Sequence, residues 1–185
     1  VVSGIVELTN DTFFNFFDVD GILRAEYTED KLVFHGDFAD LGVNIITIPR
    51  CIEISGDNAV LYDMALSIQA ADNSKVSNMT LVADNADFSL NAGAAIFVAL
   101  SEIVVLDNVV VNYTAPSDKE AIGIYANTAN GFKLTNSEIN FKATNHDWTN
   151  IIHQYGMLVA DSNDVEIAAN EFNAVLPALD VAYNY

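Results

Sequence analysis

The chain has 185 residues, of which 51% are hydrophobic, and it carries a formal net charge of −19. The apolar fraction is too high for a disordered acidic chain, so we expect a folded domain with an acidic surface. Such a surface repels nucleic acids and anionic membranes, which we exclude as partners. The longest apolar run, residues 94–106, is shorter than the about 20 residues that a membrane-spanning helix needs, so no membrane insertion is expected.

The first 42 residues differ in pattern from the rest and are expected to form an N-terminal cap and the first strands. Polar residues 9–12 precede the aromatic cluster 13–17, which is typical of a capped helical turn. Residues 18–21 are typical of a turn, and residues 32–38 of a strand. Because four phenylalanines are costly to expose, we expect the cluster to cover an open end of the core.

From residue 43 to residue 185 the sequence predicts short strands with alternating apolar residues, separated by polar turns. The predicted strands span residues 43–48, 51–54, 66–70, 76–82, 94–100, 104–106, 109–113, 122–126, 132–134, 139–141, 157–159 and 165–167, with a turn at residues 56–58. No helical periodicity is present in this part of the chain.

Four asparagines, Asn78, Asn108, Asn136 and Asn170, recur within this pattern at spacings of 30, 28 and 34 residues. A period of this size built from short strands is typical of a solenoid. We therefore predict an all-β fold, a right-handed parallel β-helix of about four to five coils. The asparagines are expected to stack as a structural ladder at one corner, with one inserted residue before Asn170; the alternative is a row of ligand-binding amides.

Acidic residues at predicted corners are weak candidates for a calcium site. Asp161, Asp164 and Glu166 cluster at one corner, and the sequence Asp18-x-Asp20 lacks the remaining ligands of a calcium loop. The alternative is that these are solvated turn residues. No other cofactor is indicated.

The segment between residues 141 and 155 is the longest excursion from the repeat. It contains His146, Asp147 and His153 together with the only tryptophan, Trp148. Because loops on a rigid scaffold often bind ligands, it is a candidate contact for surface glycans or a protein partner. The alternative is that Trp148 packs against the flank of the solenoid.

Cys51 is the only cysteine, so it forms no internal disulfide. We expect either a buried thiol in the strand 51–54 or an intermolecular disulfide. Three glycosylation sequons begin at Asn10, Asn78 and Asn112 and weakly favour an exported protein whose signal peptide has been removed.

Several segments resemble the coils of right-handed parallel β-helix proteins, in which an isoleucine, an asparagine and a phenylalanine recur. These segments are residues 78–81, 134–139 and 167–172. Residues 54–58, before the first full coil, are similar to the start of adhesin-like surface proteins of methanogenic archaea. The resemblance covers roughly residues 43–175 and implies a secreted or cell-surface protein.

The same fold includes pectate lyases and polygalacturonases, but the sequence argues against an enzyme. Such lyases use a catalytic Arg or Lys, and no arginine follows Arg50; the hydrolase motifs are also missing. We expect a non-enzymatic structural or adhesive protein that self-assembles in a surface layer, sheath or filament. The alternatives are an excised module of a glycan- or cell-binding adhesin and, more weakly, a polysaccharide lyase or hydrolase.

Overall fold

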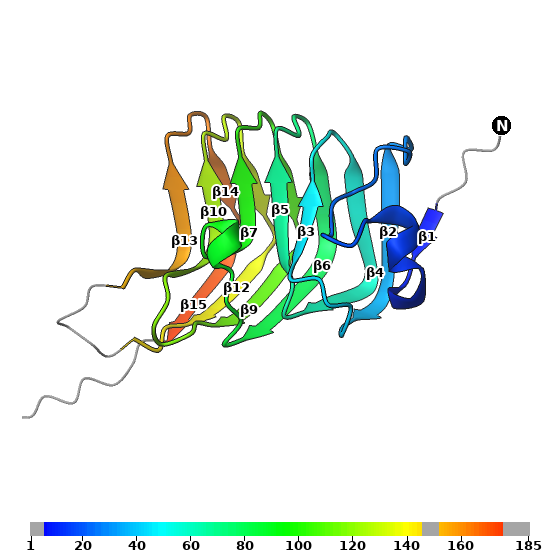
Figure 1. The fold of residues 1–185 in the computed structure, drawn as a ribbon. Helices are drawn as coiled ribbons and strands as arrows, with labels where there is room; N and C mark the ends of the chain where they lie inside the picture. The colour runs from blue at the N-terminus through cyan, green and yellow to red at the C-terminus, as the bar shows by residue number, and fades with distance from the viewer. Residues whose placement is uncertain (1–5, 146–151, 176–185) are drawn as a thin grey trace, which may run out of the picture.

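The computed structural model describes residues 6–145 and 152–175, and most of these residues lie in β-strands. The strands form two sheets, and the pairings between the named strands are parallel. Figure 1 shows the strands stacked side by side along the length of the molecule. The predicted all-β class is therefore confirmed.

The first sheet has ten strands: β1 (Val6–Leu8), β2 (Lys31–Phe38), β4 (Glu53–Tyr62), β6 (Lys75–Asp84), β8 (Val105–Asp107), β9 (Val110–Thr114), β11 (Lys133–Thr135), β12 (Glu138–Lys142), β14 (Glu166–Ala168) and β15 (Glu171–Val175). The second sheet has five: β3 (Ile45–Ile48), β5 (Ala65–Gln69), β7 (Ala94–Ala99), β10 (Ala121–Asn127) and β13 (Gln154–Ala160). Three short helical segments are η1 (Asn10–Thr12), α1 (Phe13–Phe16) and η2 (Ser89–Asn91). No helix in the described ranges is long and apolar enough to cross a membrane.

The register between neighbouring strands explains the repeat in the sequence. Partners across the later strands lie 30, 28 and then 33 residues apart, and the apolar residues of one strand face those of the next. In the second sheet one such row contains Leu66, Ile96, Ile124 and Met157. Alternation of apolar and polar residues thus places one row in the core and the next on the surface.

The first sheet bends along a line that crosses its strands. The long strand β6 pairs with β8 before the bend and with β9 after it. Residues at the bend have a left-handed backbone: φ is 56° at Asn78, 52° at Asn108, 51° at Asn136 and 56° at Ala169. Asparagine tolerates this conformation better than most residues, which explains three of these positions.

Within β4 a left-handed residue replaces a predicted turn. Asn58, with φ of 51°, lies inside β4, and the register between β4 and β6 shifts between Ser55 and Ala59. The extra residues of β4 are absorbed as a bulge, so the chain continues in the sheet. The turn predicted at residues 56–58 is therefore wrong.

The N-terminal end of the core is covered, as the sequence predicted. Thr9 and Thr12 form a capping box at η1, and Phe13 and Phe17 are fully buried with ring centroids 4.7 Å apart. The helical segments lie beside β1 at one end of the molecule (Figure 1). Because β1 and β2 belong to the first sheet, this sheet begins upstream of residue 43.

Candidate functional site

Apolar side chains are exposed at the opposite end, on the last strands β13, β14 and β15. We call the inward-facing apolar residues of these strands, with Val165 just before β14, the C-terminal end face: Met157, Val159, Val165, Ile167 and Phe172. Ile167 and Phe172 are each 46% exposed, whereas their partners in the preceding strands, Leu134 and Ile139, are buried. The residues of the end face continue the rows of the core but lack a covering layer among the described residues.

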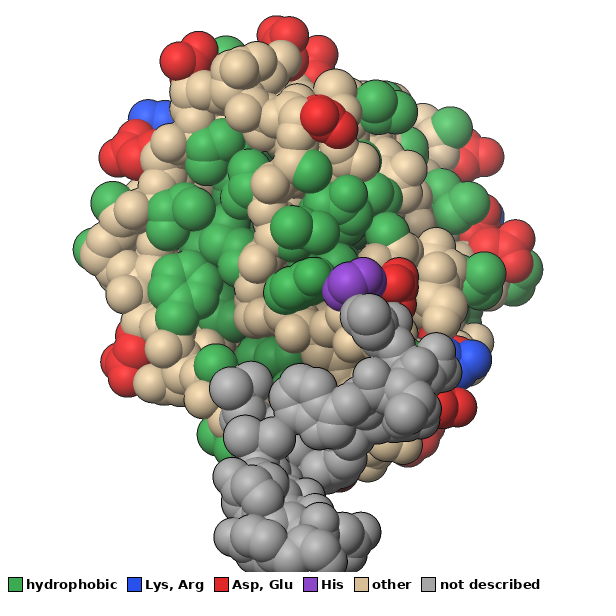
Figure 2. All heavy atoms as spheres, turned by 90° about the vertical axis from the view of Figure 1, so that its left-hand side faces the viewer, with side chains coloured by type: hydrophobic (Ala, Val, Ile, Leu, Met, Phe, Trp, Pro, Cys, Tyr) green, Lys and Arg blue, Asp and Glu red, His purple; other side chains and the backbone are tan. Residues whose placement is uncertain are grey.

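The same end is also the last position of both sheets among the described strands. In each sheet the order ends on these strands, and no described strand pairs with their outer edges. The end view in Figure 2 shows hydrophobic side chains gathered over the middle of this end, with acidic side chains around the periphery. Exposed strand edges and a contiguous apolar surface are the two features that most often mark a site of protein association.

The acidic corner residues near this end take part in turns and in a surface ion pair. Asp161 and Asp164 occupy left-handed corners with φ of 48° and 55°, and Glu166 pairs with Lys133 at 2.7 Å. Across residues 6–145 and 152–175, no three His, Cys, Asp or Glu side chains are placed to bind a metal ion. A calcium site at this corner stays a prediction.

Asp18 has a similar role in the N-terminal segment. Its Oδ1 accepts hydrogen bonds from the backbone N–H groups of Asp20 at 3.0 Å and Ile22 at 2.8 Å. The carboxylate thus closes a turn, as is common for aspartate.

The predicted asparagine ladder contains fewer amide–amide hydrogen bonds than expected, and Ala169 rather than Asn170 takes the last position of the row. The Nδ2 of Asn108 donates to Oδ1 of Asn78 at 2.7 Å, but Asn136 donates to Asp107 at 2.8 Å. The strand register aligns Asn136 with Ala169, and Ala169 has the left-handed backbone. Including Asn170 in the row, and the inserted residue that this required, was therefore wrong.

Asn170 instead holds the backbone of the preceding layer. Its Oδ1 accepts from the backbone N–H of Ser137 at 2.8 Å, and its Nδ2 donates to the carbonyl of Leu134 at 2.8 Å. In the preceding layer the Ser137 hydroxyl accepts from the N–H of Val109 at 3.0 Å. Asn170 thus satisfies partly buried backbone groups at the bend, a different role from amide stacking.

A second row of amides, which the sequence interpretation missed, crosses the outer surface of β9, β12 and β15. Asn140 donates to Asn112 at 2.8 Å, and Asn173 donates to Asn140 at 2.9 Å. These residues are in register across the three strands. The signal in the sequence is their spacing of 28 and 33 residues, which follows the register of the strands.

A polar hollow of about 400 Å³ lies between the bend and this second row. Its lining residues are Asn108, Val110, Asn136, Ser137, Glu138, Ala169, Asn170 and Glu171. Glu138 accepts a hydrogen bond from Asn140, and Glu171 accepts one from Asn173. No lining residue is basic, and the hollow combines the two carboxylates with three amides and one hydroxyl.

Hydrogen bonds at the edge of this hollow lower the pKa of Asp107. The Nδ2 of Asn136 and the hydroxyl of Thr135 donate to the same carboxylate oxygen, at 2.8 and 2.9 Å. Both bonds favour the charged carboxylate, so its pKa lies below the ordinary value for aspartate.

Cys51 is exposed, so the predicted buried thiol is wrong. Its Sγ lies 3.7 Å from the carbonyl oxygen of Asn73, on the neighbouring layer. Cys51 precedes β4, and the side chain of the next residue, Ile52, enters the core instead. An intermolecular disulfide remains a prediction.

The predicted binding loop is described only at its two ends, up to residue 145 and from residue 152. His146, Asp147 and Trp148 lie outside the described residues. His153 is exposed; its ring stacks on that of Tyr155 at 5.8 Å, and its Nδ1 lies 3.0 Å from the Tyr155 hydroxyl.

The asparagines of the three sequons use their side-chain oxygens within the fold. Asn10 accepts from the backbone N–H of Ala39 at 3.1 Å, while Asn78 and Asn112 accept from other asparagines. Asn78 is nevertheless exposed. Glycosylation at these positions stays a prediction.

Both arginines stabilise the N-terminal segment. Arg24 donates to the carbonyls of Phe14 and Phe17, and Arg50 donates to those of Tyr27, Glu29 and Cys51.

Comparison of the chain with models of protein families, with curated proteins and with solved structures finds no match.

Proposed function

We propose that this chain is a non-enzymatic structural or adhesive protein of the cell exterior that self-associates through its C-terminal end face. In this proposal the two sheets belong to a right-handed parallel β-helix of about four to five coils. The observation that carries it is the exposure of Ile167 and Phe172 in rows whose other members are buried.

Association of two copies at this end combines two favourable contributions. Contact removes apolar side chains from water, and strand edges gain hydrogen-bond partners. The opposite end is covered by β1 and by Phe13 and Phe17, so a C-terminal end face meets another C-terminal end face more readily than it meets an N-terminal end. Pairing of the same surface on both copies gives a closed two-fold dimer.

Charge and the exposed thiol shape this assembly further. The net charge of −19 opposes association, so added salt should strengthen it by screening the repulsion. Cys51 lies away from the end face, and an intermolecular disulfide there would join neighbouring dimers. Both features suit an assembly outside the cell, where salt is abundant and disulfides persist.

Sedimentation equilibrium over a range of protein and salt concentrations tests the proposal. The wild type in reductant should form dimers that strengthen with salt, and removing reductant should add larger species that Cys51→Ser abolishes. Phe172→Asp and Ile167→Asp should give monomers, whereas Val19→Asp, at a residue that is 79% exposed outside the end face, should not. A wild type that stays monomeric at high concentration and high salt would overturn the proposal.

A glycan-binding adhesin module is the second candidate function, and the polar hollow at the bend favours it. The carboxylates of Glu138 and Glu171 and the neighbouring amides offer acceptors to sugar hydroxyls, and the acidic surface disfavours anionic glycans. Binding to immobilised neutral polysaccharides that is lost in Glu138→Ala, but not in the control Glu102→Ala, would support this function. Release of unsaturated or reducing ends from a polysaccharide would instead indicate an enzyme.

A further inference from the structure

Asn130 and Gly131 form the only Asn–Gly pair in the chain. They lie in the turn between β10 and β11, where Gly131 has a left-handed backbone with φ of 69°. An asparagine deamidates most readily before glycine, because glycine has no Cβ to keep its backbone nitrogen away from the neighbouring side chain. The pair is therefore a candidate site of spontaneous covalent modification.

The next layer of the fold holds both residues in place. The N–H of Gly131 donates to the carbonyl of Asn163 at 2.8 Å. The Oδ1 of Asn130 accepts hydrogen bonds from the backbone N–H of Asn163 at 3.0 Å and from its Nδ2 at 3.2 Å. The backbone nitrogen that would attack and the amide that it would attack are thus bound to the same residue. Deamidation therefore requires that the turn containing Asn163 moves away.

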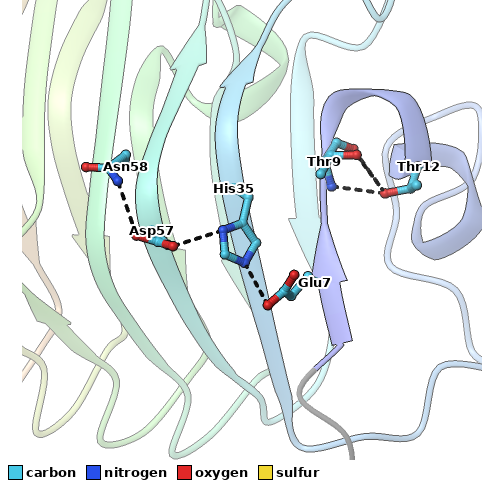
Figure 3. A network of polar contacts seen from close by, with 6 residues as sticks. All are labelled: Glu7, Thr9, Thr12, His35, Asp57 and Asn58. Atoms are coloured by element: carbon cyan, nitrogen blue, oxygen red, sulfur yellow. Dashed lines mark hydrogen bonds and ion pairs between the residues drawn. The ribbon is translucent and has the colours of Figure 1, made fainter.

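Asn163 belongs to the last layer at the C-terminal end, which has fewer supports than the N-terminal end. The residues of β14 and β15 are exposed, and no described strand lies beyond them. At the N-terminal end, η1 is capped, and His35 on β2 lies 3.1 Å from Oδ2 of Asp57 on β4 and 3.5 Å from Oε1 of Glu7 on β1 (Figure 3). Because segments with few buried contacts open at a low free-energy cost, the last layer should open more readily than the layers beneath it.

We propose that Asn130 is a site of spontaneous deamidation whose rate is set by opening of the last layer. When the turn at residues 161–164 opens, the backbone nitrogen of Gly131 attacks Cγ of Asn130 and forms a C–N bond. The side-chain nitrogen takes up the proton from the attacking N–H and leaves as ammonia. Water then opens the resulting succinimide ring at either carbonyl, which gives aspartate or isoaspartate at position 130.

The two products have different effects on the turn. Aspartate keeps a side-chain oxygen that accepts hydrogen bonds from Asn163. Isoaspartate adds one carbon to the backbone, which moves the N–H of Gly131 out of line with Asn163 and loosens the last layer. Because the last layer carries the C-terminal end face, isoaspartate would also weaken association; this consequence rests on the proposed function.

Peptide mapping by mass spectrometry during incubation at mildly alkaline pH tests the proposal. Asn130 in the wild type should deamidate more slowly than in a free peptide of residues 127–135, because the last layer must open first. Val165 directly follows the turn and packs against the core. Val165→Ala should raise the rate at Asn130 about five-fold, the order expected when a half-buried side chain is shortened.

A second Asn–Gly pair, placed one layer closer to the middle of the molecule, gives an internal control. Ile103 occupies the position of Gly131 in the preceding layer: its N–H donates to the carbonyl of Asn130 at 2.8 Å, and its φ is 56°. Glu102→Asn combined with Ile103→Gly should therefore fit this turn. The new pair should deamidate more slowly than Asn130 in the same chain, because two layers must open.

Three results would each overturn the proposal: a wild-type rate equal to that of the free peptide, equal rates at the two pairs, or no acceleration in Val165→Ala. Repeating the mapping in Phe172→Asp separates this proposal from the association proposal. If this variant is monomeric and Asn130 still deamidates faster than the engineered pair, the modification does not depend on assembly. If the wild type never associates, the proposed function fails while the peptide map still decides the modification.

Discussion

Leu134 and Ile167 occupy the same position in adjacent parallel strands, yet Leu134 is fully buried and Ile167 is 46% exposed. The difference arises because β11 lies between β8 and β14, whereas β14 ends the strand order of the sheet. Ile167, which continues a row of core residues, therefore lies on the surface. This relationship is the basis of the proposed association at the C-terminal end face.

The two residues should differ strongly in their contribution to monomer stability. Leu134→Ala removes a buried side chain and should lower the free energy of unfolding by about 2–5 kcal/mol. Ile167→Ala should cost about 1 kcal/mol or less, since much of the side chain is already in contact with water. Urea unfolding at low protein concentration checks the pair; equal losses would mean that Ile167 is covered in the monomer.

The corrected register at the bend predicts opposite effects for two adjacent residues. Ala169→Asn should raise the free energy of unfolding by about 0.5–1 kcal/mol, because asparagine tolerates the left-handed backbone better than alanine. Asn170→Ala should lower it by about 1–3 kcal/mol, because the backbone N–H of Ser137 and the carbonyl of Leu134 lose their partner. Thermal unfolding of both variants is the measurement, and a destabilising Ala169→Asn would contradict the corrected register.

Substitutions at Gly21 and Gly42 distinguish the energetic cost of backbone strain from the cost of a steric clash. Both have a left-handed backbone, with φ of 79° and 72°. A Cβ at Gly21 would lie 2.2 Å from the carbonyl oxygen of Ile45, whereas a Cβ at Gly42 would meet no atom within 4 Å. Gly42→Ala should cost about 1–2 kcal/mol from strain alone. Gly21→Ala should cost at least about 1 kcal/mol more, because the β3 backbone must move.

Chemical denaturation of the two glycine variants gives both costs. The contact argument is contradicted if Gly21→Ala is no more destabilising than Gly42→Ala.

Asp107 should contribute to stability at neutral pH and lose that contribution in acid. Its pKa in the folded protein is lowered, so the stabilisation is present above the ordinary pKa of aspartate, about 4, and disappears as the pH falls through the folded value. The effect should be about 0.5 kcal/mol or less, because the carboxylate is partly exposed.

The measurement is the difference in unfolding free energy between wild type and Asp107→Asn, followed from pH 7 downward. We expect the wild-type advantage to shrink below about pH 4. An advantage that grows in acid would contradict the assigned direction.

The sequence predicted the strands well because each strand has a local signal. Alternation places Leu32 and Phe34 in the core, and the polar run before the phenylalanine cluster marks the capped helical turn; the structure confirms both. Parallel pairing also followed from the period, since similar segments recur about 30 residues apart.

The site could not be predicted in the same way, because its features depend on neighbours that are distant in sequence. Ala169 takes the left-handed position, although alanine gives no sequence signal for this conformation. The adjacent Asn170 was therefore predicted in its place. Cys51 has an apolar neighbour in Ile52, which suggested a strand, but the residue precedes β4. The His35 contacts join β1, β2 and β4, which alternation alone does not place in register.

The central claim, that the C-terminal end face joins two copies, is tested most directly by amide exchange in β13, β14 and β15 at increasing protein concentration. The account predicts that protection in these three strands rises with concentration, while protection in β2 does not change. The rise should be absent in Phe172→Asp. Exchange in β13, β14 and β15 that is the same at every concentration would contradict the claim.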